Sequence, residues 1–176
     1  MRRNILVTGA TGKQGSALIR ALLQPAQSTT SDSDPNSTPE YHIYALTRKI
    51  STPTAQALLS MHGSSNLTVV EGDLDDPSSI TAVFETAKLD SDGGIWGVFA
   101  VMAFAGLGAN SEGEERQGKM LANIALEYRV EVYVYSSAMR AGPKYEEKLD
   151  LKPSAKAKRN IEEHCVALGE KGLRWM

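Results

Sequence analysis

The segment that decides the fold runs Ile5-Leu6-Val7-Thr8-Gly9-Ala10-Thr11-Gly12-Lys13-Gln14-Gly15. Its apolar start predicts a strand, and residues 16–23 predict a helix that follows at once. The three glycines would let the chain turn sharply at Gly9, let a phosphate approach Gly12 and let the helix pack closely at Gly15. The helix N-terminus would offer the phosphates unpaired N–H groups and a positive dipole end. We therefore predict a dinucleotide-binding turn; the alternative is a glycine-rich turn without a ligand.

The rest of the chain alternates apolar strands with helical patterns, which is typical of a parallel sheet covered by helices on both faces. Further strands are predicted near 42–46, 67–71, 98–103 and 130–135, and further helices near 54–61, 77–87, 114–128 and 154–168. The predicted fold class is α/β, a three-layer Rossmann-like sheet. Residues 172–176 look like the start of a sixth strand, so we expect this chain to be part of a longer protein.

One segment interrupts the alternation. Residues 24–39 read QPAQSTTSDSDPNSTP, and this composition predicts a disordered surface insertion. Without these 16 residues, the sequence separation between Gly15 and Arg48 would fall from 33 to 17 positions. That restores the usual distance of about 20 between the glycine turn and the ribose-reading position. We expect residues 1–176 to form one dinucleotide-binding domain whose C-terminal substrate or partner region is absent.

The composition limits the classes of molecule that this chain is expected to bind. The 176 residues carry a net charge of −2, so no basic surface indicates direct nucleic-acid binding. No apolar run approaches the roughly 18 residues that span a bilayer, so no membrane partner is expected. The one cysteine, Cys165, excludes an internal disulfide and fits a reducing compartment. We interpret it as a packed apolar residue rather than a reactive thiol, and we expect a cytoplasmic protein, with the nucleus as a second location.

The ends of the second and third predicted strands indicate the cofactor. An NAD site would place an acidic residue near Thr47, but the chain continues with Arg48, whose guanidinium suits a 2′-phosphate. With Lys13 as a second charge, NADP is favoured over NAD; the alternative is that Arg48 is a solvated loop charge. Asp73 and Leu74 are predicted to contact adenine, and helix capping is the alternative. A metal is not expected, because no His or Cys lies near these acids.

The fifth predicted strand ends at Ser136, which would lie near the nicotinamide. Ordinary short-chain dehydrogenases pair such a serine with Tyr-x-x-x-Lys. Tyr145 is the only tyrosine after Ser137, and Leu149 stands where the lysine would be. The absence of the Tyr-x-x-x-Lys motif argues against the standard interconversion of alcohols and ketones.

Together these residues resemble the NmrA-like family, atypical members of the short-chain dehydrogenase/reductase superfamily. The resemblance covers nearly the whole chain and rests on GATGKQG at 9–15, LTRK at 46–49, EGDLDD at 71–76, ERQGKMLA at 115–122, VYVYSSA at 132–138 and KRNIE at 158–162. It implies NADP(H) in an extended cleft, with the 2′-phosphate at Arg48 and Lys158 near the nicotinamide ribose. The predicted cofactor-binding residues are Gly9, Thr11, Gly12, Lys13, Gln14, Gly15, Arg48, Asp73, Leu74, Ala103, Phe104, Ser136 and Lys158.

The resemblance also implies two functions, because some family members are redox-sensing regulators with protein partners and others reduce quinones or similar molecules. The family often has Thr-Asn and an aromatic residue after the fourth strand, whereas this chain has Met102-Ala103-Phe104. That loss favours an NADP(H)-binding redox sensor without strong catalytic activity. The alternatives are an NADPH-dependent oxidoreductase in which Lys158 is catalytic, and a truncated product with little function. The oligomeric state is not predicted.

Overall fold

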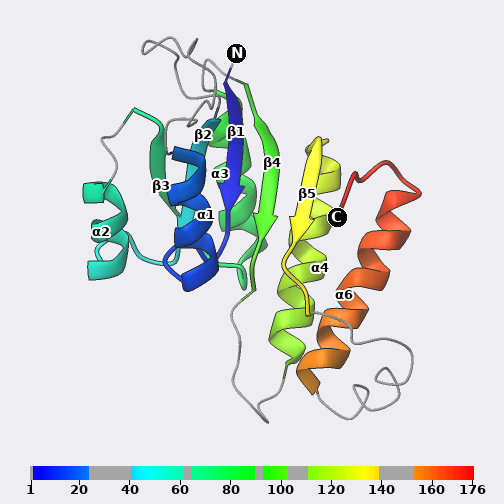
Figure 1. Cartoon of the computed structure of the whole chain (residues 1–176). Helices are drawn as coiled ribbons and strands as arrows, with labels where there is room; N and C mark the ends of the chain where they lie inside the picture. Colours follow the sequence, from blue (N-terminus) through cyan, green and yellow to red (C-terminus); the bar gives the residue numbers. More distant parts are fainter. Residues whose placement is uncertain (1, 24–40, 62–64, 90–92, 103–110, 139–152) are drawn as a thin grey trace, which may run out of the picture.

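The computed structural model describes residues 2–23, 41–61, 65–89, 93–102, 111–138 and 153–176. Five strands form one parallel sheet in the order β3-β2-β1-β4-β5 (Figure 1). They are β1 (Arg3–Val7), β2 (Tyr41–Thr47), β3 (Leu67–Glu71), β4 (Ile95–Ala100) and β5 (Val132–Tyr135). The order reverses between β1 and β4, which is where open α/β sheets bind their ligands.

Helices cover both faces of the sheet. One apolar core packs under α1 (Lys13–Leu23) and α2 (Pro53–Met61), and the other under α3 (Pro77–Lys88), α4 (Glu112–Glu127) and α6 (Pro153–Gly169). Neighbouring residues of β1 divide between the two cores, with Ile5 in the first and Leu6 in the second, because successive side chains of a strand point to opposite faces. The predicted three-layer Rossmann-like α/β fold is confirmed.

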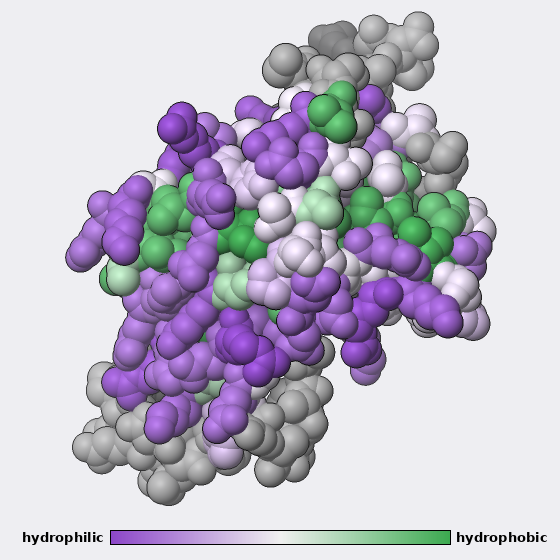
Figure 2. Space-filling view, turned by 180° about the vertical axis from the view of Figure 1, so that it is seen from behind, coloured by the Kyte–Doolittle hydropathy of each residue, from purple (hydrophilic) through white to green (hydrophobic). Residues whose placement is uncertain are grey.

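The rear face of the molecule is mixed in character. Figure 2 shows hydrophilic side chains over much of this face, with hydrophobic side chains gathered across its middle. Three large apolar residues of the described chain are exposed: Leu89, Val166 and Met176. Within the described ranges, no helix is both long and apolar enough to cross a bilayer.

Most predicted elements begin or end one to three residues from the observed bounds, and three of these differences are instructive. The fourth strand runs from Ile95 to Ala100, not 98–103, because the Val101 N–H donates to the Thr8 hydroxyl (2.7 Å) instead of continuing the ladder. The fifth begins at Val132, because the Val130 N–H donates to the Ala125 carbonyl (2.9 Å) in the last turn of α4. Helix α1 begins three residues early, so the glycine turn continues directly into it.

The last residues lie along β5. The Tyr133 N–H donates to the Arg174 carbonyl (2.8 Å), and the Met176 N–H donates to the Tyr133 carbonyl (2.9 Å). Trp175 thereby bridges Tyr133 in the parallel sense, which is the position predicted for a sixth strand. The predicted insertion at 24–39 lies outside the described residues.

Candidate functional site

A cleft of about 1110 Å³ lies along the carboxyl edge of the sheet. Its walls come from the end of β2, from the segments that follow all five strands, from the first turns of α1 and α2, and from Gln117 of α4 and Lys158 of α6. We call Thr47, Arg48 and Lys49 its β2 end, and Ser136, Ser137 and Lys158 its β5 end. Ten of the predicted cofactor-binding residues line it: Gly9, Thr11, Gly12, Lys13, Gln14, Arg48, Asp73, Leu74, Ser136 and Lys158. Ala103 and Phe104 lie outside the described residues.

The glycine turn forms the middle of the cleft. Gly9 has a φ of +59°, a conformation that side chains rarely adopt, and the Gly12 N–H donates to the Gly9 carbonyl (2.9 Å). Gly15 does not line the cleft but lies beneath the turn, where a Cβ would stand only 2.4 Å from the Gly9 oxygen and 2.8 Å from the Ala10 Cα. These close approaches leave the N-terminus of α1 facing the cleft, where it can hold an anion.

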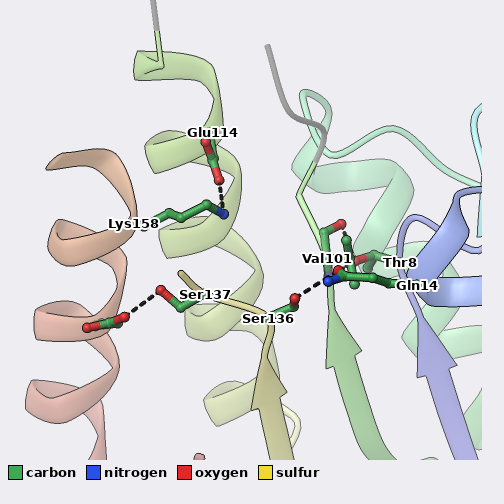
Figure 3. A network of polar contacts seen from close by, with 8 residues as sticks. Thr8, Gln14, Val101, Glu114, Ser136, Ser137 and Lys158 are labelled. Atoms are coloured by element: carbon green, nitrogen blue, oxygen red, sulfur yellow. Dashed lines mark hydrogen bonds and ion pairs between the residues drawn. The ribbon is translucent and has the colours of Figure 1, made fainter. Parts of the chain in front are cut away.

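Thr8 ties this turn to the segment after β4. The fully buried hydroxyl donates to the Val101 carbonyl (2.9 Å) and accepts from the Val101 N–H (2.7 Å), as Figure 3 shows. This role of Thr8 was not predicted, although a polar residue at the end of an apolar strand is a usable signal. Val101 and Met102, which also line the cleft, are positioned by this pair of bonds.

The cleft carries charges of both signs near its β2 end. Arg48 and Asp75 line the cleft, and Asp75 Oδ1 lies 2.5 Å from Arg116 Nη2 on α4. Hydrogen bonds from Gln117 and Arg116, together with the charges of Arg116 and Arg48, lower the pKa of Asp75. Asp75 is therefore a carboxylate at neutral pH. Neither Asp75 nor Gln117 was singled out from the sequence, because only the packing of α4 brings them together.

The acidic residues after β3 have different roles. Asp76 caps α3 by accepting from the Ser78 N–H (3.0 Å). Asp73 shapes the turn, since its Oδ1 accepts from the Asp75 N–H (3.0 Å) and its own N–H donates to Ser79 Oγ (2.9 Å). Capping thus belongs to Asp76, while Asp73 and Leu74 line the cleft where adenine contact is predicted.

The polar groups of the β5 end are all bonded within the protein. Ser136 Oγ donates to Gln14 Oε1 (2.9 Å), and Ser137 Oγ donates to the Glu162 carboxylate. Lys158 Nζ lies 2.6 Å from Glu114 Oε1 (Figure 3). Behind them, burial and the Glu114 charge raise the pKa of the Tyr135 phenol well above its ordinary value. Tyr135 is consequently a poor proton donor near neutral pH.

Metal binding finds no support in the part of the chain that is described, where no three His, Cys, Asp or Glu side chains come together in a suitable group. The residues of the cleft instead suit an elongated anion. An anion-binding turn lies at the centre, with a cationic side chain toward each end.

The family to which the chain belongs follows from its match to a known protein family. The sequence model of the NmrA-like family matches residues 1–172. The chain belongs to the NmrA-like family. No curated protein sequence matched it.

Solved structures share the fold of this NmrA-like chain. The NADPH-dependent quinone oxidoreductase QOR2 of Escherichia coli, complexed with NADPH, is 21% identical with a TM-score of 0.61, over 97% of this chain and 46% of its own. Citrobacter sp. triphenylmethane reductase complexed with NADP(H) is 20% identical with a TM-score of 0.63, over 93% of this chain and 45% of its own. Bordetella bronchiseptica WbmH complexed with NAD+ is 15% identical with a TM-score of 0.68, over 99% of this chain and 55% of its own. The chain thus spans about half the length of these proteins.

Proposed function

We propose that this NmrA-like chain binds NADP(H) and serves as a redox-sensing regulatory protein without strong catalytic activity. The observation that carries the binding proposal is the layout of the cleft, with Arg48 at the β2 end, the glycine turn in the middle and Lys158 at the β5 end. Three strand spacings separate β2 from β5, roughly 14 Å. That span suits an extended dinucleotide whose pyrophosphate lies on the N-terminus of α1.

The charges favour NADP over NAD. Thr47, Arg48 and Lys49 at the β2 end include no acidic side chain that would accept hydrogen bonds from a ribose 2′-hydroxyl, and the nearby Asp75 is paired with Arg116 of α4. A guanidinium forms charge-assisted, often bidentate bonds with a phosphate. The family relationship and the NADPH and NADP(H) complexes of two structural neighbours support the same choice.

The bonding at the β5 end favours a sensor. Ser136 is bonded to Gln14, Ser137 to Glu162 and Lys158 to Glu114, so each polar group there already has a partner. A general acid needs a proton that it can release near the operating pH. A site whose polar groups are held by partners within the protein can bind either redox form of the cofactor and report it to a regulatory protein partner.

A second candidate is an NADPH-dependent reductase of quinones or similar small molecules. Lys158 favours it, because the ammonium group lines the cleft and could donate a proton. The reaction would move a hydride from NADPH and one proton to a quinone, giving NADP+ and hydroquinone. The quinone oxidoreductase among the structural neighbours supports this reading.

The test is calorimetric titration with NADPH, NADP+ and NADH, followed by an assay of NADPH consumption with menadione, a simple quinone. The sensor proposal expects NADPH and NADP+ to bind with different affinities and menadione to be left unreduced. Turnover that disappears in Lys158→Met would replace the sensor with the reductase. Failure of all three cofactors to bind would contradict both candidates.

A further inference from the structure

The ion pair of Glu114 and Lys158 joins a buried carboxylate to a partly exposed ammonium group of the cleft wall. Glu114 lies in the first turn of α4 with its side chain 1% exposed, and Lys158 of α6 is 21% exposed. Oε1 of the glutamate meets Lys158 Nζ at 2.6 Å, whereas its buried Oε2 has no hydrogen-bond partner among the described residues. Burying a carboxylate is unfavourable unless it is paired. Lys158 is therefore the group that makes this burial tolerable.

Glu114 has the sequence position of a residue that caps its own helix, α4. Ser111 is the N-cap of α4, and a glutamate three residues later has the spacing of a capping box. In the structure the Ser111 side chain makes no capping bond, and its buried hydroxyl has no partner in the described ranges. Glu114 reaches Lys158 on another helix instead (Figure 3). The geometry of Glu114 is thus set by Lys158 rather than by the capping of its own helix.

Other contacts also hold α4 against α6. Asn160 Nδ2 donates to Glu115 Oε2 (2.8 Å), and Gly118 lies so close to Ile161 that a Cβ would stand 2.5 Å from its Cδ1. These contacts join the two helices away from the cleft, since none of the four residues lines it. The Glu114 pair differs from them in holding a residue of the cleft wall.

Lys158 is restrained on two sides and accessible on a third. Its Nζ lies 2.6 Å from the carboxylate and 5.7 Å from the centre of the Tyr135 ring, within reach of a cation–π interaction. An ammonium group has three N–H donors, and one goes to Glu114. The others remain for a hydrogen-bond acceptor inside the cleft.

We propose that Glu114 is a positioning residue that holds the Lys158 ammonium at the β5 end of the cleft, where it donates to a hydroxyl or carbonyl oxygen in the nicotinamide riboside half of NADP(H). This inference rests on the proposed function. It adds Glu114 to the arrangement that the family resemblance implies, with Arg48 at the phosphorylated adenosine half and Lys158 at the other. Loss of Glu114 should therefore weaken the binding of the whole cofactor without weakening the binding of its adenosine half.

The experiment compares Glu114→Gln with Glu115→Gln in the full 176-residue chain. Glu115 is a matched control, because it is the neighbouring carboxylate, pairs with Lys119 at 2.6 Å and also joins α4 to α6. The probes are NADPH and 2′,5′-ADP, which carries the adenosine and 2′-phosphate but lacks the nicotinamide riboside. Circular dichroism and urea denaturation check that each variant is folded.

E114Q should lower NADPH affinity roughly tenfold and change 2′,5′-ADP affinity less than about twofold, as for a weakened charge-assisted bond. E115Q should leave both affinities unchanged. In a Lys158→Met background, E114Q should cause no further loss of NADPH affinity, because Glu114 acts through the lysine. If Lys158→Met does not fold, the comparison of E114Q with E115Q still tests whether Glu114 supports binding of the nicotinamide riboside half.

Three results would overturn the inference. NADPH affinity of E114Q equal to that of the unchanged protein would remove the positioning role and leave the proposed function intact. Equal losses for NADPH and 2′,5′-ADP would assign Glu114 to the structure of the whole cleft. Absence of NADPH binding by the unchanged chain would overturn the proposed function itself and this inference with it.

Discussion

Gly15 lies so close to Gly9 that a Cβ at position 15 would stand 2.4 Å from the Gly9 carbonyl oxygen. The first turn of α1 therefore presses directly on the glycine turn, and both are fixed relative to β1. The Gly12 N–H, 2.9 Å from the same carbonyl oxygen, adds a second contact. This contact sets where the N-terminus of α1 meets the cleft, which is the feature that phosphate binding requires.

Gly15→Ala should consequently destabilise the protein and weaken NADPH binding. The added methyl meets backbone atoms rather than a movable side chain, and overpacking of this kind costs about 1–3 kcal/mol of the free energy of unfolding. Urea denaturation and NADPH titration measure the two effects. Gly113→Ala is the control, because its Cβ would meet only the Arg116 guanidinium at 4.0 Å. It should leave NADPH affinity nearly unchanged and should not lower the free energy of unfolding, since alanine favours a helix over glycine. Equal behaviour of the two variants would contradict the close approach.

Arg48→Ala should separate the two cofactors. Removing a charge-assisted bond to the 2′-phosphate should cost about 1–3 kcal/mol of NADPH binding, whereas NADH, which lacks that phosphate, should bind as before. Calorimetric titrations of both cofactors against both proteins measure the difference. Parallel losses would show that Arg48 acts on the shape of the β2 end rather than on the phosphate.

Asp75→Asn should act in the opposite direction. Asp75 lines the cleft with Arg48, and hydrogen bonds from Gln117 and Arg116 lower its pKa, so it carries a negative charge at neutral pH. Its loss should raise NADPH affinity about two- to fivefold and leave NADH affinity unchanged, because only NADPH brings a phosphate to this end. The gain should shrink at high salt, as expected for solvent-exposed charges. A gain of the same size for NADH would point to a change of shape instead.

The glycine turn and the strand order explain why so much of the site was predictable from the sequence. Gly9, Gly12 and Gly15 are required by local backbone geometry, and local geometry can be read from spacing. Parallel strands bring their carboxyl ends to one edge, so residues that follow different strands, such as Arg48, Asp73 and Ser136, were expected together.

The missed residues, such as Thr8, Asp75 and Glu114, depend on contacts between segments far apart in the sequence. Glu114 and Lys158 are 44 positions apart, and Arg116 and Asp75 are 41 positions apart. Helical periodicity indicates which face of α4 is buried, but it does not indicate which neighbouring helix supplies the partner of a given side chain. The wrong start of the fifth strand has a related cause, because the apolar Val130 fits a strand pattern while its N–H bonds back to Ala125.

Acid should destabilise the fold in part through Glu115. The hydrogen bond from Lys119, the bond from Asn160 and nearby lysine charges lower the pKa of Glu115 below its usual 4.5. A lowered pKa contributes stability at pH values above the unfolded value, and that contribution is lost as the pH falls through the folded value. The urea midpoint should therefore drop between about pH 5 and about pH 3. Glu115→Gln should reduce this drop, whereas Glu170→Gln, which changes an exposed carboxylate, should preserve it.

Cys165 should be unreactive until the protein unfolds. The residue is fully buried on α6, and burial raises the pKa of its thiol to about 11. Because only the thiolate is nucleophilic, a shift from 9 to about 11 reduces the reactive fraction at about pH 8 by roughly 100-fold, before access is considered. Ellman's reagent should thus react slowly with the native chain and rapidly in denaturing urea. The rate at intermediate urea should follow the fraction unfolded, measured by circular dichroism. Rapid reaction of the native chain would instead identify an accessible, reactive thiol and contradict the packed position of Cys165.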